Sequence, residues 1–366
     1  MQYIFDNAAY INNYACMLNK KEATFSASIS VSIVGARGYS GLELARLLLQ
    51  HPMVKLEKAF ATQKFSLSDE LLDKRAQDVQ CLTEDQLMTN LTDILFLATP
   101  AEVSLKLVPA LLSAGKKVID LSGAFRLQKN DYSQWYLFEH SSPETLKRAQ
   151  YGLVPFSPAF DRHTQLIANP GCYATAISLA LIPLLKRDLI SSENLVIDAK
   201  SGTTGAGRKA SENLLYAEVD GNCLPYKVGR HQHWPEIQEA VENFSGKKIE
   251  AHFATHLLPT KRGILASIYA QSQTTSLEEI QQAFEEDYGN ENLILHGKDI
   301  SRLAKLSSVV GTAKTMISYE LVGNRLYLFS AIDNLMKGAA SQAVENLNRL
   351  LDLPADFSLE NQETRI

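Results

Sequence analysis

Cysteines, long apolar stretches and runs of like charge are all scarce in this sequence of 366 residues. Its four cysteines (Cys16, Cys81, Cys172 and Cys223) are widely spaced and form no CxxC pair, which argues against a disulfide framework or a cysteine zinc site. No apolar stretch approaches the roughly 20 residues of a membrane-spanning helix. The net charge is −5 without a block of like charge, so nucleic acid is not an expected partner. These absences predict a globular protein of a reducing compartment, the cytoplasm, without membrane contact.

The chain divides into a patternless start and two regions of regular pattern. Residues 1–28 have no clear period and no continuous apolar core, so we expect a disordered tail there. From residue 29 onward, short apolar segments alternate with helical ones, as in βαβ units around a parallel sheet. The expected strands are Ile29–Val34, Met53–Phe60, Ile94–Ala98 and Lys117–Leu121, with a helix over Ala101–Ala114.

The second half has more strands and fewer helices between them. An apolar helix is expected over Tyr173–Arg187, and an amphipathic helix over Leu335–Leu351 closes the chain. The strand-like segments are Leu195–Lys200, Ile249–His256, Gly263–Ala270 and Arg325–Ala331. The sequence therefore predicts an α/β protein in which a Rossmann-type parallel-sheet domain is joined to an α+β domain with a mixed or antiparallel sheet.

A glycine-rich turn follows the first expected strand and opens a helix. Gly35, Gly38 and Gly41 have the spacing GxxGxxG, a variant of the dinucleotide-binding fingerprint. Such glycines let the backbone approach a pyrophosphate, and the helix N-terminus attracts its negative charge. A turn without a ligand is the alternative, but the strand before it and the helix after it favour cofactor binding. The cofactor-binding candidates are Gly35, Arg37, Gly38, Tyr39, Ser40 and Gly41.

The second expected strand ends without the acidic residue that an NAD site uses to hold the adenosine ribose. The segment there is Ala-Thr-Gln-Lys (61–64). Thr62 can donate a hydrogen bond and Lys64 adds a positive charge, so the pair suits a 2′-phosphate. We therefore expect NADP as the cofactor; Lys64 as a solvated loop residue is the alternative.

Cys172 occurs in an unusual local setting, directly after Asn-Pro-Gly (169–171) and at the start of the apolar helix. A thiol at a helix N-terminus has a pKa below the usual ~8.5, and the thiolate is the nucleophilic form. A small buried cysteine is the alternative. The sequence thus makes Cys172 the candidate nucleophile.

The motif HQHWPE (231–236) supports that assignment with a candidate acid/base. Pro235 and the acid after it mark a helix start, whose dipole lowers the pKa of a nearby imidazole. His231 and His233 could also be metal ligands, but no third ligand accompanies them at metal spacing, so no metal is expected. We prefer His231 as the acid/base, because Gly229 before it lets the chain turn toward the site.

The segment SGTTGAGRK (201–209) follows a strand and alternates glycine with hydroxyl residues. Its backbone amides and its two cations, Arg208 and Lys209, can cradle an anion, although a mobile turn has the same composition. It is not a P-loop, because GxxxxGK[ST] is absent. With NADP and a thiolate, the chemistry narrows to attack on an acyl phosphate, loss of phosphate and hydride reduction of the thioester to an aldehyde.

Six separated motifs together resemble the N-acetyl-γ-glutamyl-phosphate reductase family of the semialdehyde dehydrogenase group. In chain order they are VSIVGARGYSGLELARLL (31–48), NPGCYAT (169–175), SGTTGAGR (201–208), HQHWPEI (231–237), HLLPTKRGILASIY (256–269) and AIDNLMKGAASQAVENLN (331–348). The resemblance covers about residues 30–352. It implies a catalytic domain of the glyceraldehyde-3-phosphate dehydrogenase type, NADPH as reductant, and a homo-oligomer, either dimer or tetramer.

The resemblance also implies an activity and roles for residues. The activity is reduction of N-acetyl-γ-glutamyl phosphate to N-acetylglutamate 5-semialdehyde and phosphate, a step of arginine biosynthesis. Cys172 becomes the thioester nucleophile, with His231 or His233 as acid/base; Thr99 and Asn334 join the cofactor site. Residues 29–169 and 334–366 form the NADP-binding domain, and 170–333 the catalytic and oligomerisation domain. The substrate-binding candidates are Arg126, Asn169, Ser201, Gly202, Arg208 and Lys209.

Two departures from the family pattern leave substrate binding open. Ala124 stands where the family usually has an acid before Phe-Arg, and YGLVP (151–155) replaces YGLPE. One alternative function is a reductase of a related acyl phosphate, such as aspartyl or acetylaminoadipyl phosphate. Another is a non-catalytic NADP-binding sensor. A cysteine hydrolase is disfavoured, because GxxGxxG after a first strand has no role in one.

Overall fold

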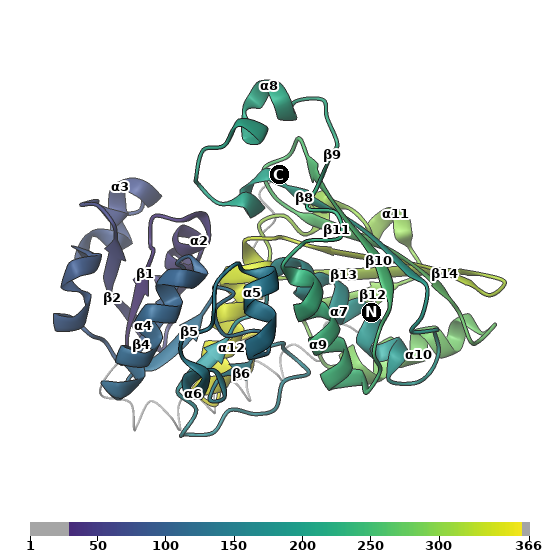
Figure 1. The fold of residues 1–366 in the computed structure, drawn as a ribbon, viewed down its shortest axis with the longest axis horizontal. Helices are drawn as coiled ribbons and strands as arrows, with labels where there is room; N and C mark the ends of the chain where they lie inside the picture. Colours follow the sequence, from purple (N-terminus) through teal and green to yellow (C-terminus); the bar gives the residue numbers. More distant parts are fainter. Residues whose placement is uncertain (1–28, 361–366) are drawn as a thin grey trace, which may run out of the picture.

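The computed structural model describes residues 29–360, so the tail expected over residues 1–28 lies outside the described residues. Two seven-stranded sheets organise the described chain, one in each half of the molecule (Figure 1). Within these residues, no helix combines the length and the apolar character that crossing a membrane requires.

The first sheet is entirely parallel and has the strand order β3-β2-β1-β4-β5-β7-β6. Every residue of β4 is buried, as expected for a parallel strand covered on both faces. Because β1 lies between β2 and β4, the loop after β1 emerges where the strand order reverses, the usual ligand position in such sheets. The strands are β1 (Ile29–Val34), β2 (Val54–Ala61), β3 (Gln80–Thr83), β4 (Ile94–Leu97), β5 (Lys117–Asp120), β6 (Gln150–Tyr151) and β7 (Leu166–Ala168).

Helices cover this sheet, and one of them comes from the end of the chain. Leu44 and Leu48 of α2 share an apolar cluster with Val344 and Leu347 of α12. The helix near the end of the chain therefore packs against the helix that follows the glycine-rich loop, and the domain boundaries expected from the sequence remain predictions. The helices of this part are α2 (Tyr39–Leu48), α3 (Leu67–Leu71), α4 (Ala101–Ser113), α5 (Tyr132–Trp135), α6 (Pro143–Leu146) and α12 (Ser341–Leu350), with short 3-10 turns η1 (Lys74–Asp78), η2 (Glu84–Thr89) and η3 (Lys129–Asp131).

The second sheet has the order β12-β13-β14-β11-β8-β10-β9 and is mixed. Its β8–β10 and β12–β13 pairs are parallel and its other pairs are antiparallel. The two sheets confirm the predicted fold class. The strands are β8 (Leu195–Gly202), β9 (Leu224–Tyr226), β10 (Ala251–Leu258), β11 (Ile264–Gln271), β12 (Ile294–Gly297), β13 (Thr315–Val322) and β14 (Arg325–Ile332).

The apolar helix α7 (Cys172–Leu185) packs in the core of the second sheet together with α9 (His233–Ser245) and α10 (Leu277–Tyr288) (Figure 1). Every residue of α7 after Cys172 is buried, which explains its nearly continuous apolar sequence. After β14, a single π-helical turn, η7 (Met336–Ala340), leads the chain back to the first sheet. The remaining short elements are α8 (Tyr216–Val219), α11 (Ile300–Leu303), η4 (Thr203–Ala206), η5 (Glu212–Leu214) and η6 (Leu306–Ser308).

Candidate active site

A cavity of about 490 Å³ lies between the end of the first sheet and the start of α7. Its wall combines the glycine-rich loop after β1, the candidate nucleophile and the loop after β8. The structure thus brings together residues that are far apart in the sequence. The lining residues are Gly38, Tyr39, Ser40, Ala98, Pro100, Leu121, Arg126, Gly171, Cys172, Thr204, Gly205, Ala206, Gly207, Arg208, Lys209, His233, Asn334, Leu335, Gly338 and Ala339.

The glycine-rich loop has the shape that a dinucleotide needs. Gly35 has φ +82°, and a Cβ there would lie 2.4 Å from the Ala98 carbonyl oxygen. A Cβ at Gly41 would lie 2.4 Å from the Gly35 carbonyl oxygen, so both positions require glycine. No side chain caps the start of α2, which leaves its first amides available to an anion beside the cavity.

Of the predicted cofactor residues, Gly35, Arg37 and Gly41 belong to the glycine-rich loop without lining the cavity, and three more, outside that loop, do not line it either. Thr62 and Lys64 are exposed beyond the end of β2. The Thr99 hydroxyl is buried and lies 2.8 Å from the Ser104 hydroxyl. Their cofactor roles remain predictions.

Arg37 is held in a charged cluster that joins the two halves. Its Nε donates to Glu70 Oε1 at 2.8 Å. Arg208 approaches from the loop after β8 and donates to the Arg37 carbonyl oxygen at 2.6 Å and to Glu70 Oε2 at 3.4 Å. Sequence reasoning missed Glu70, because nothing in its segment marks it as a partner of two distant arginines.

Cys172 is the first residue of α7, as predicted, but its thiol is not acidic in this environment. Burial raises the pKa of the Cys172 thiol to about 11, against the opposing effects of the Tyr173 amide and the Arg126 guanidinium. The expected lowering of this pKa is therefore wrong for the free enzyme. The helix start favours the thiolate, but removal of the sulfur from water disfavours it more strongly.

The two histidines lie against each other at the start of α9, which begins at His233 and not at Pro235. The backbone at Gln232 is already helical. The His233 amide donates to His231 Nδ1 at 3.1 Å, and the ring centroids are 4.9 Å apart. Burial lowers the pKa of His231 to about 2 and that of His233 to about 3, so both rings are neutral. The direction agrees with the prediction, but burial is the main cause.

His233 is the histidine that reaches the cofactor side of the site. It lines the main cavity together with Cys172, and both also line a second cavity of about 280 Å³. His231 lines the second cavity only, with Ser201 and Lys227 among its neighbours there. A Cβ at Gly171 would lie 2.4 Å from His233 Nε2, which places that imidazole beside the residue preceding the nucleophile.

Arg126 lines the main cavity and is held by backbone carbonyl oxygens. Its side chain is only 5% exposed, and its Nε and Nη2 donate to the carbonyl oxygens of Asn169 and Leu121 at 2.8 and 2.7 Å. Its Nη1 lies 3.4 Å from Glu236 Oε2. Sequence reasoning treated Glu236 only as a sign of a helix start and missed it as a site residue.

The remaining substrate candidates separate into two groups. Arg208 and Lys209 line the main cavity, and Ser201 lines the second one. Asn169 and Gly202 line neither. The Asn169 side chain is buried among Ala339 and Asn346, to which it is hydrogen bonded, and Gly202 packs against backbone atoms of residues 261–262.

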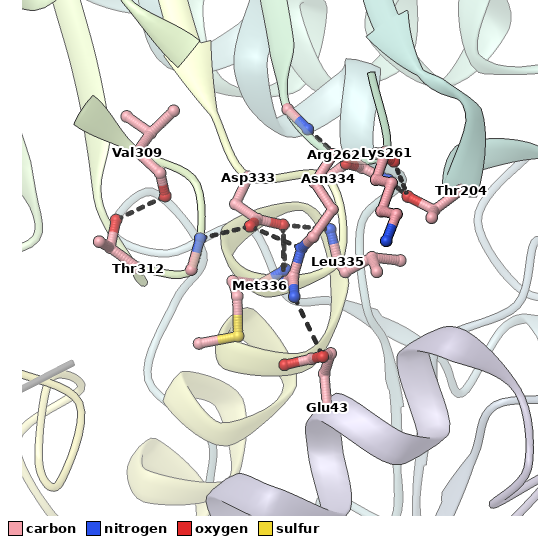
Figure 2. A network of polar contacts seen from close by, with 12 residues as sticks. Glu43, Thr204, Lys261, Arg262, Val309, Thr312, Asp333, Asn334, Leu335 and Met336 are labelled. Atoms are coloured by element: carbon pink, nitrogen blue, oxygen red, sulfur yellow. Dashed lines mark hydrogen bonds and ion pairs between the residues drawn. The ribbon is translucent and has the colours of Figure 1, made fainter. Parts of the chain in front are cut away.

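Asn334 is fixed at the cavity wall by its neighbours (Figure 2). Its Nδ2 donates to Thr204 Oγ1 at 3.0 Å, and its Oδ1 accepts from the Gly263 amide at 2.8 Å. One amide hydrogen of Asn334 is left for a ligand, since a side-chain amide carries two.

Asp333, the residue before it, is fully buried at the centre of a polar network that ties the two halves together (Figure 2). Its carboxylate accepts from the Leu335 and Gly311 amides at 2.8 and 2.7 Å, and its Oδ2 lies 2.9 Å from Arg262 Nε. Arg262 also pairs with Glu43 of α2 at 3.0 Å. The network therefore links α2, the helix that follows the glycine-rich loop, to the chain segment that carries Asn334.

No three His, Cys, Asp or Glu side chains within residues 29–360 are grouped so that they could hold a metal ion. The acid, base and anion-binding groups of the two cavities are a thiol, two neutral imidazoles, backbone amides and several cations. Together they suit attack of a thiol on an acyl group that carries negative charge.

Comparison with solved structures supports the two-domain fold. An aspartate semialdehyde dehydrogenase II from Vibrio cholerae, complexed with ASA, aligns with a TM-score of 0.67 and 17% identity over 89% of this chain and 99% of that one. A probable aspartate-semialdehyde dehydrogenase from Pseudomonas aeruginosa aligns with a TM-score of 0.63 and 20% identity, over 89% of this chain and 99% of that one. At these identities the likeness shows the fold alone.

Sequence comparison is more specific. The semialdehyde dehydrogenase NAD binding domain matches residues 30–161, and the semialdehyde dehydrogenase dimerisation domain matches residues 172–334. The N-acetyl-gamma-glutamyl-phosphate reductase of Acinetobacter baylyi is 40% identical over 90% of this chain and 98% of its own length. That of Halothermothrix orenii is 39% identical over 91% and 98%. The chain therefore belongs to the N-acetyl-γ-glutamyl-phosphate reductase family.

Proposed function

We propose that this protein reduces N-acetyl-γ-glutamyl phosphate to N-acetylglutamate 5-semialdehyde and phosphate, with NADPH as the reductant, in arginine biosynthesis. The observation that carries this proposal is the shared cavity. Cys172 and the glycine-rich loop after β1 line the same space, so a nucleophile and a nicotinamide cofactor can act on one carbonyl group.

The cavity offers a fitting set of groups for the cofactor. The loop shaped by Gly35 and Gly41 brings backbone amides to the cavity, and Gly38, Tyr39 and Ser40 line it. We assign these residues to the pyrophosphate and Asn334, with its remaining amide hydrogen, to another polar group of the cofactor. When bound there, NADPH supplies the hydride that converts the thioester to the aldehyde level.

Cys172 attacks as a thiol that loses its proton during bond formation, because its pKa of about 11 leaves it neutral at physiological pH. The sulfur bonds to the γ-carbonyl carbon, a neighbouring neutral imidazole takes the S–H proton, and phosphate leaves with the electrons of the C–O bond. The product is a thioester on Cys172. After reduction, the imidazolium returns the proton as aldehyde and thiol separate.

Negative charge that develops in this reaction meets two kinds of donor. The first amides of α7, including that of Cys172, are free of side-chain caps and can stabilise the oxyanion. Arg126, Arg208 and Lys209 line the cavity and can hold the carboxylate and phosphate groups of the substrate. Ser201 lines the second cavity, so it contacts only a substrate that extends from the main cavity into the second one.

The geometry favours His233 over His231 as the proton carrier. His233 lines the cavity that contains both the nucleophile and the cofactor loop, whereas His231 is behind it. The ring of His231 is bound to the His233 amide through Nδ1 and so holds the turn that presents His233. This reverses the preference for His231 as the acid/base that the sequence suggested.

We propose a homo-oligomer whose subunits meet at the outer face of the second sheet. α7, α9 and α10 cover the other face, whereas Val196 and Tyr269, which are cross-strand partners, are each 38% exposed. Neighbouring exposed apolar side chains on a sheet face that these helices leave uncovered are suited to contact with a second subunit. Sedimentation velocity checks this: a Val196→Glu, Tyr269→Glu double variant is expected to sediment as a smaller species than wild type.

The reverse reaction tests the activity directly. N-acetylglutamate 5-semialdehyde, NADP⁺ and inorganic phosphate are mixed with the protein, and NADPH formation is followed at its absorbance band. We expect turnover that depends on all three reactants. A protein that turns over only aspartate semialdehyde or the acetylaminoadipyl analogue is a related reductase, and one that turns over none of these aldehydes is not a reductase of this group.

A further inference from the structure

Glu236 is a buried acid beside the nucleophile that the catalytic steps above do not use. Its side chain has no exposure to solvent, although it lies in the first turn of α9, next to the active-site histidines. A carboxylate is kept at such a position only when donors surround it, because burial of an unpaired charge is costly.

The donors to Glu236 come from three separate parts of the active site. Oε1 accepts from the Gly171 amide at 2.7 Å and from the Tyr151 hydroxyl at 2.8 Å. Oε2 faces Arg126 Nη1 at 3.4 Å. Gly171 is the N-cap residue directly before Cys172, and Arg126 lines the main cavity with it. One carboxylate therefore holds both the turn that precedes the nucleophile and the cation beside it.

Space around Gly171 leaves little freedom for this arrangement. A Cβ there would lie 2.4 Å from His233 Nε2 and 2.8 Å from Arg126 Nη1. The turn, the imidazole and the guanidinium are thus packed against one another, and Glu236 contacts both the turn and the guanidinium. Its own helix also carries His233, so the acid and the proton carrier share one rigid element.

We propose that Glu236 is a positioning residue for the nucleophile, because its carboxylate fixes the turn at Gly171 and orients Arg126 beside Cys172. This role rests on the proposed function of Cys172. It has two separable parts: the reach of the side chain holds the turn, and its negative charge balances the positive charge of Arg126. The titratable and charged groups that surround Arg126 and Glu236 are Asp120, Tyr136, Tyr151, Cys172, His233 and Glu239.

Two substitutions separate the two parts. Glu236→Gln keeps the length and an oxygen for the Gly171 amide but removes the charge. Glu236→Asp keeps the charge but is one methylene too short to reach Gly171 and Arg126 together. Glu242→Gln is the matched control, since Glu242 lies on the same helix with its side chain 46% exposed.

The readouts are the rate of Cys172 alkylation by iodoacetamide as a function of pH, followed by mass spectrometry of the Cys172 peptide, and kcat of the reverse reaction. In Glu236→Gln, Arg126 is uncompensated and favours the thiolate, so we expect the alkylation curve to move to lower pH by on the order of one unit. In Glu236→Asp the curve should stay in place. Displacement of the turn should lower kcat of the Asp variant about tenfold to a hundredfold, with KM for NADP⁺ unchanged.

A merely structural acid would give a different result, namely a lower melting temperature in both variants with neither readout changed in the folded protein. That result, or a Gln variant whose alkylation curve coincides with wild type, overturns the proposal. Should Glu236→Gln not fold, kcat of Glu236→Asp decides, and a wild-type value overturns it. Alkylation needs neither substrate nor cofactor, so a wild-type protein that lacks the proposed activity counts against the proposed function and not against this role.

Discussion

Gly338 and Cys172 touch across the junction between the two halves of the molecule: a Cβ at Gly338 would lie 2.6 Å from Cys172 Cβ. Gly338 belongs to the π-helical turn η7, and such turns are frequent at functional sites. The same segment carries Asn334 at the cavity wall and Asp333 in the network with Arg262. The backbone that leads back to the first sheet therefore also packs directly against Cβ of the nucleophile.

Gly338→Ala should consequently impair the chemistry more than cofactor binding. The added methyl group forces Cys172 or η7 to move, and a displacement near 1 Å at a reacting atom costs up to about a hundredfold in rate. We expect kcat to fall about tenfold to a hundredfold while KM for NADPH stays close to wild type. Gly297→Ala is the control, because the nearest atom to its added Cβ is a Leu303 methyl group at 3.4 Å. A Gly338→Ala variant with wild-type kcat would show that the structure accommodates the methyl group without displacing Cys172.

Removal of the nucleophile should abolish turnover and spare the cofactor. Cys172→Ala deletes the atom that forms the thioester but leaves the glycine-rich loop untouched. Steady-state assays should find no reduction, and fluorescence titration should find NADPH affinity near that of wild type. Cys223→Ala, a change at an exposed thiol, serves as the control. If Cys172→Ala retained even about a tenth of wild-type turnover, the covalent mechanism would be wrong.

The raised pKa of Cys172 predicts that its thiol reacts slowly with alkylating agents in the free enzyme. With a pKa of about 11, the thiolate fraction is small at pH 7 and rises about tenfold per pH unit until the pH approaches that value. The alkylation rate of Cys172 should therefore keep rising between pH 7 and pH 10. A plateau that begins below pH 8 would mean that the thiolate is stabilised in the free enzyme after all.

The pKa of Cys172 was expected to be lowered and is raised, and the reason shows which properties can be inferred from sequence. Cys172 at a helix start is a local feature, and the structure has it as predicted. The burial that raises its pKa comes from the surrounding structure, in which Gly338 packs against Cys172 from 166 positions away, and no local sequence pattern indicates that contact. Glu236, Asp333 and Glu70 were missed for the same reason, since their partners come from distant segments.

The fold was easier to predict from the sequence than the contacts of the site, because buried strands and helix starts have local sequence patterns. The apolar runs at β1 and β4 and the glycine-rich loop between strand and helix identified the first domain. Strand β13 was missed although a signal was present: Gly323 and Asn324 separate it from β14 by two residues, the spacing of a tight hairpin. Its alternation is incomplete, since three consecutive residues, Ile317–Tyr319, are buried.

A charge reversal at Lys64 tests the preference for NADPH. If Lys64 contacts the 2′-phosphate, Lys64→Glu removes a charge-assisted contact worth about 1.5–3 kcal/mol and raises KM for NADPH at least about tenfold. KM for NADH should change much less, which narrows the gap between the two cofactors. Lys74→Glu, at another exposed position of the same domain, controls for net charge. An unchanged KM for NADPH would leave Arg37 and Arg208 as the candidates for this phosphate.

The histidine pair gives the sharpest test of the mechanism, because the two rings are 4.9 Å apart yet only His233 lines the main cavity. Loss of the proton carrier should cut kcat by roughly 10²–10⁴ and remove one limb of the pH–rate profile. We expect this result for His233→Asn. His231→Asn should keep both limbs and mainly raise the KM of the substrate or lower stability, since its ring holds the turn at His233. His252→Asn, on the exposed side of β10, is the control. If His231→Asn alone loses a limb, the roles are those that the sequence suggested. If neither variant loses one, the proton leaves Cys172 by another route.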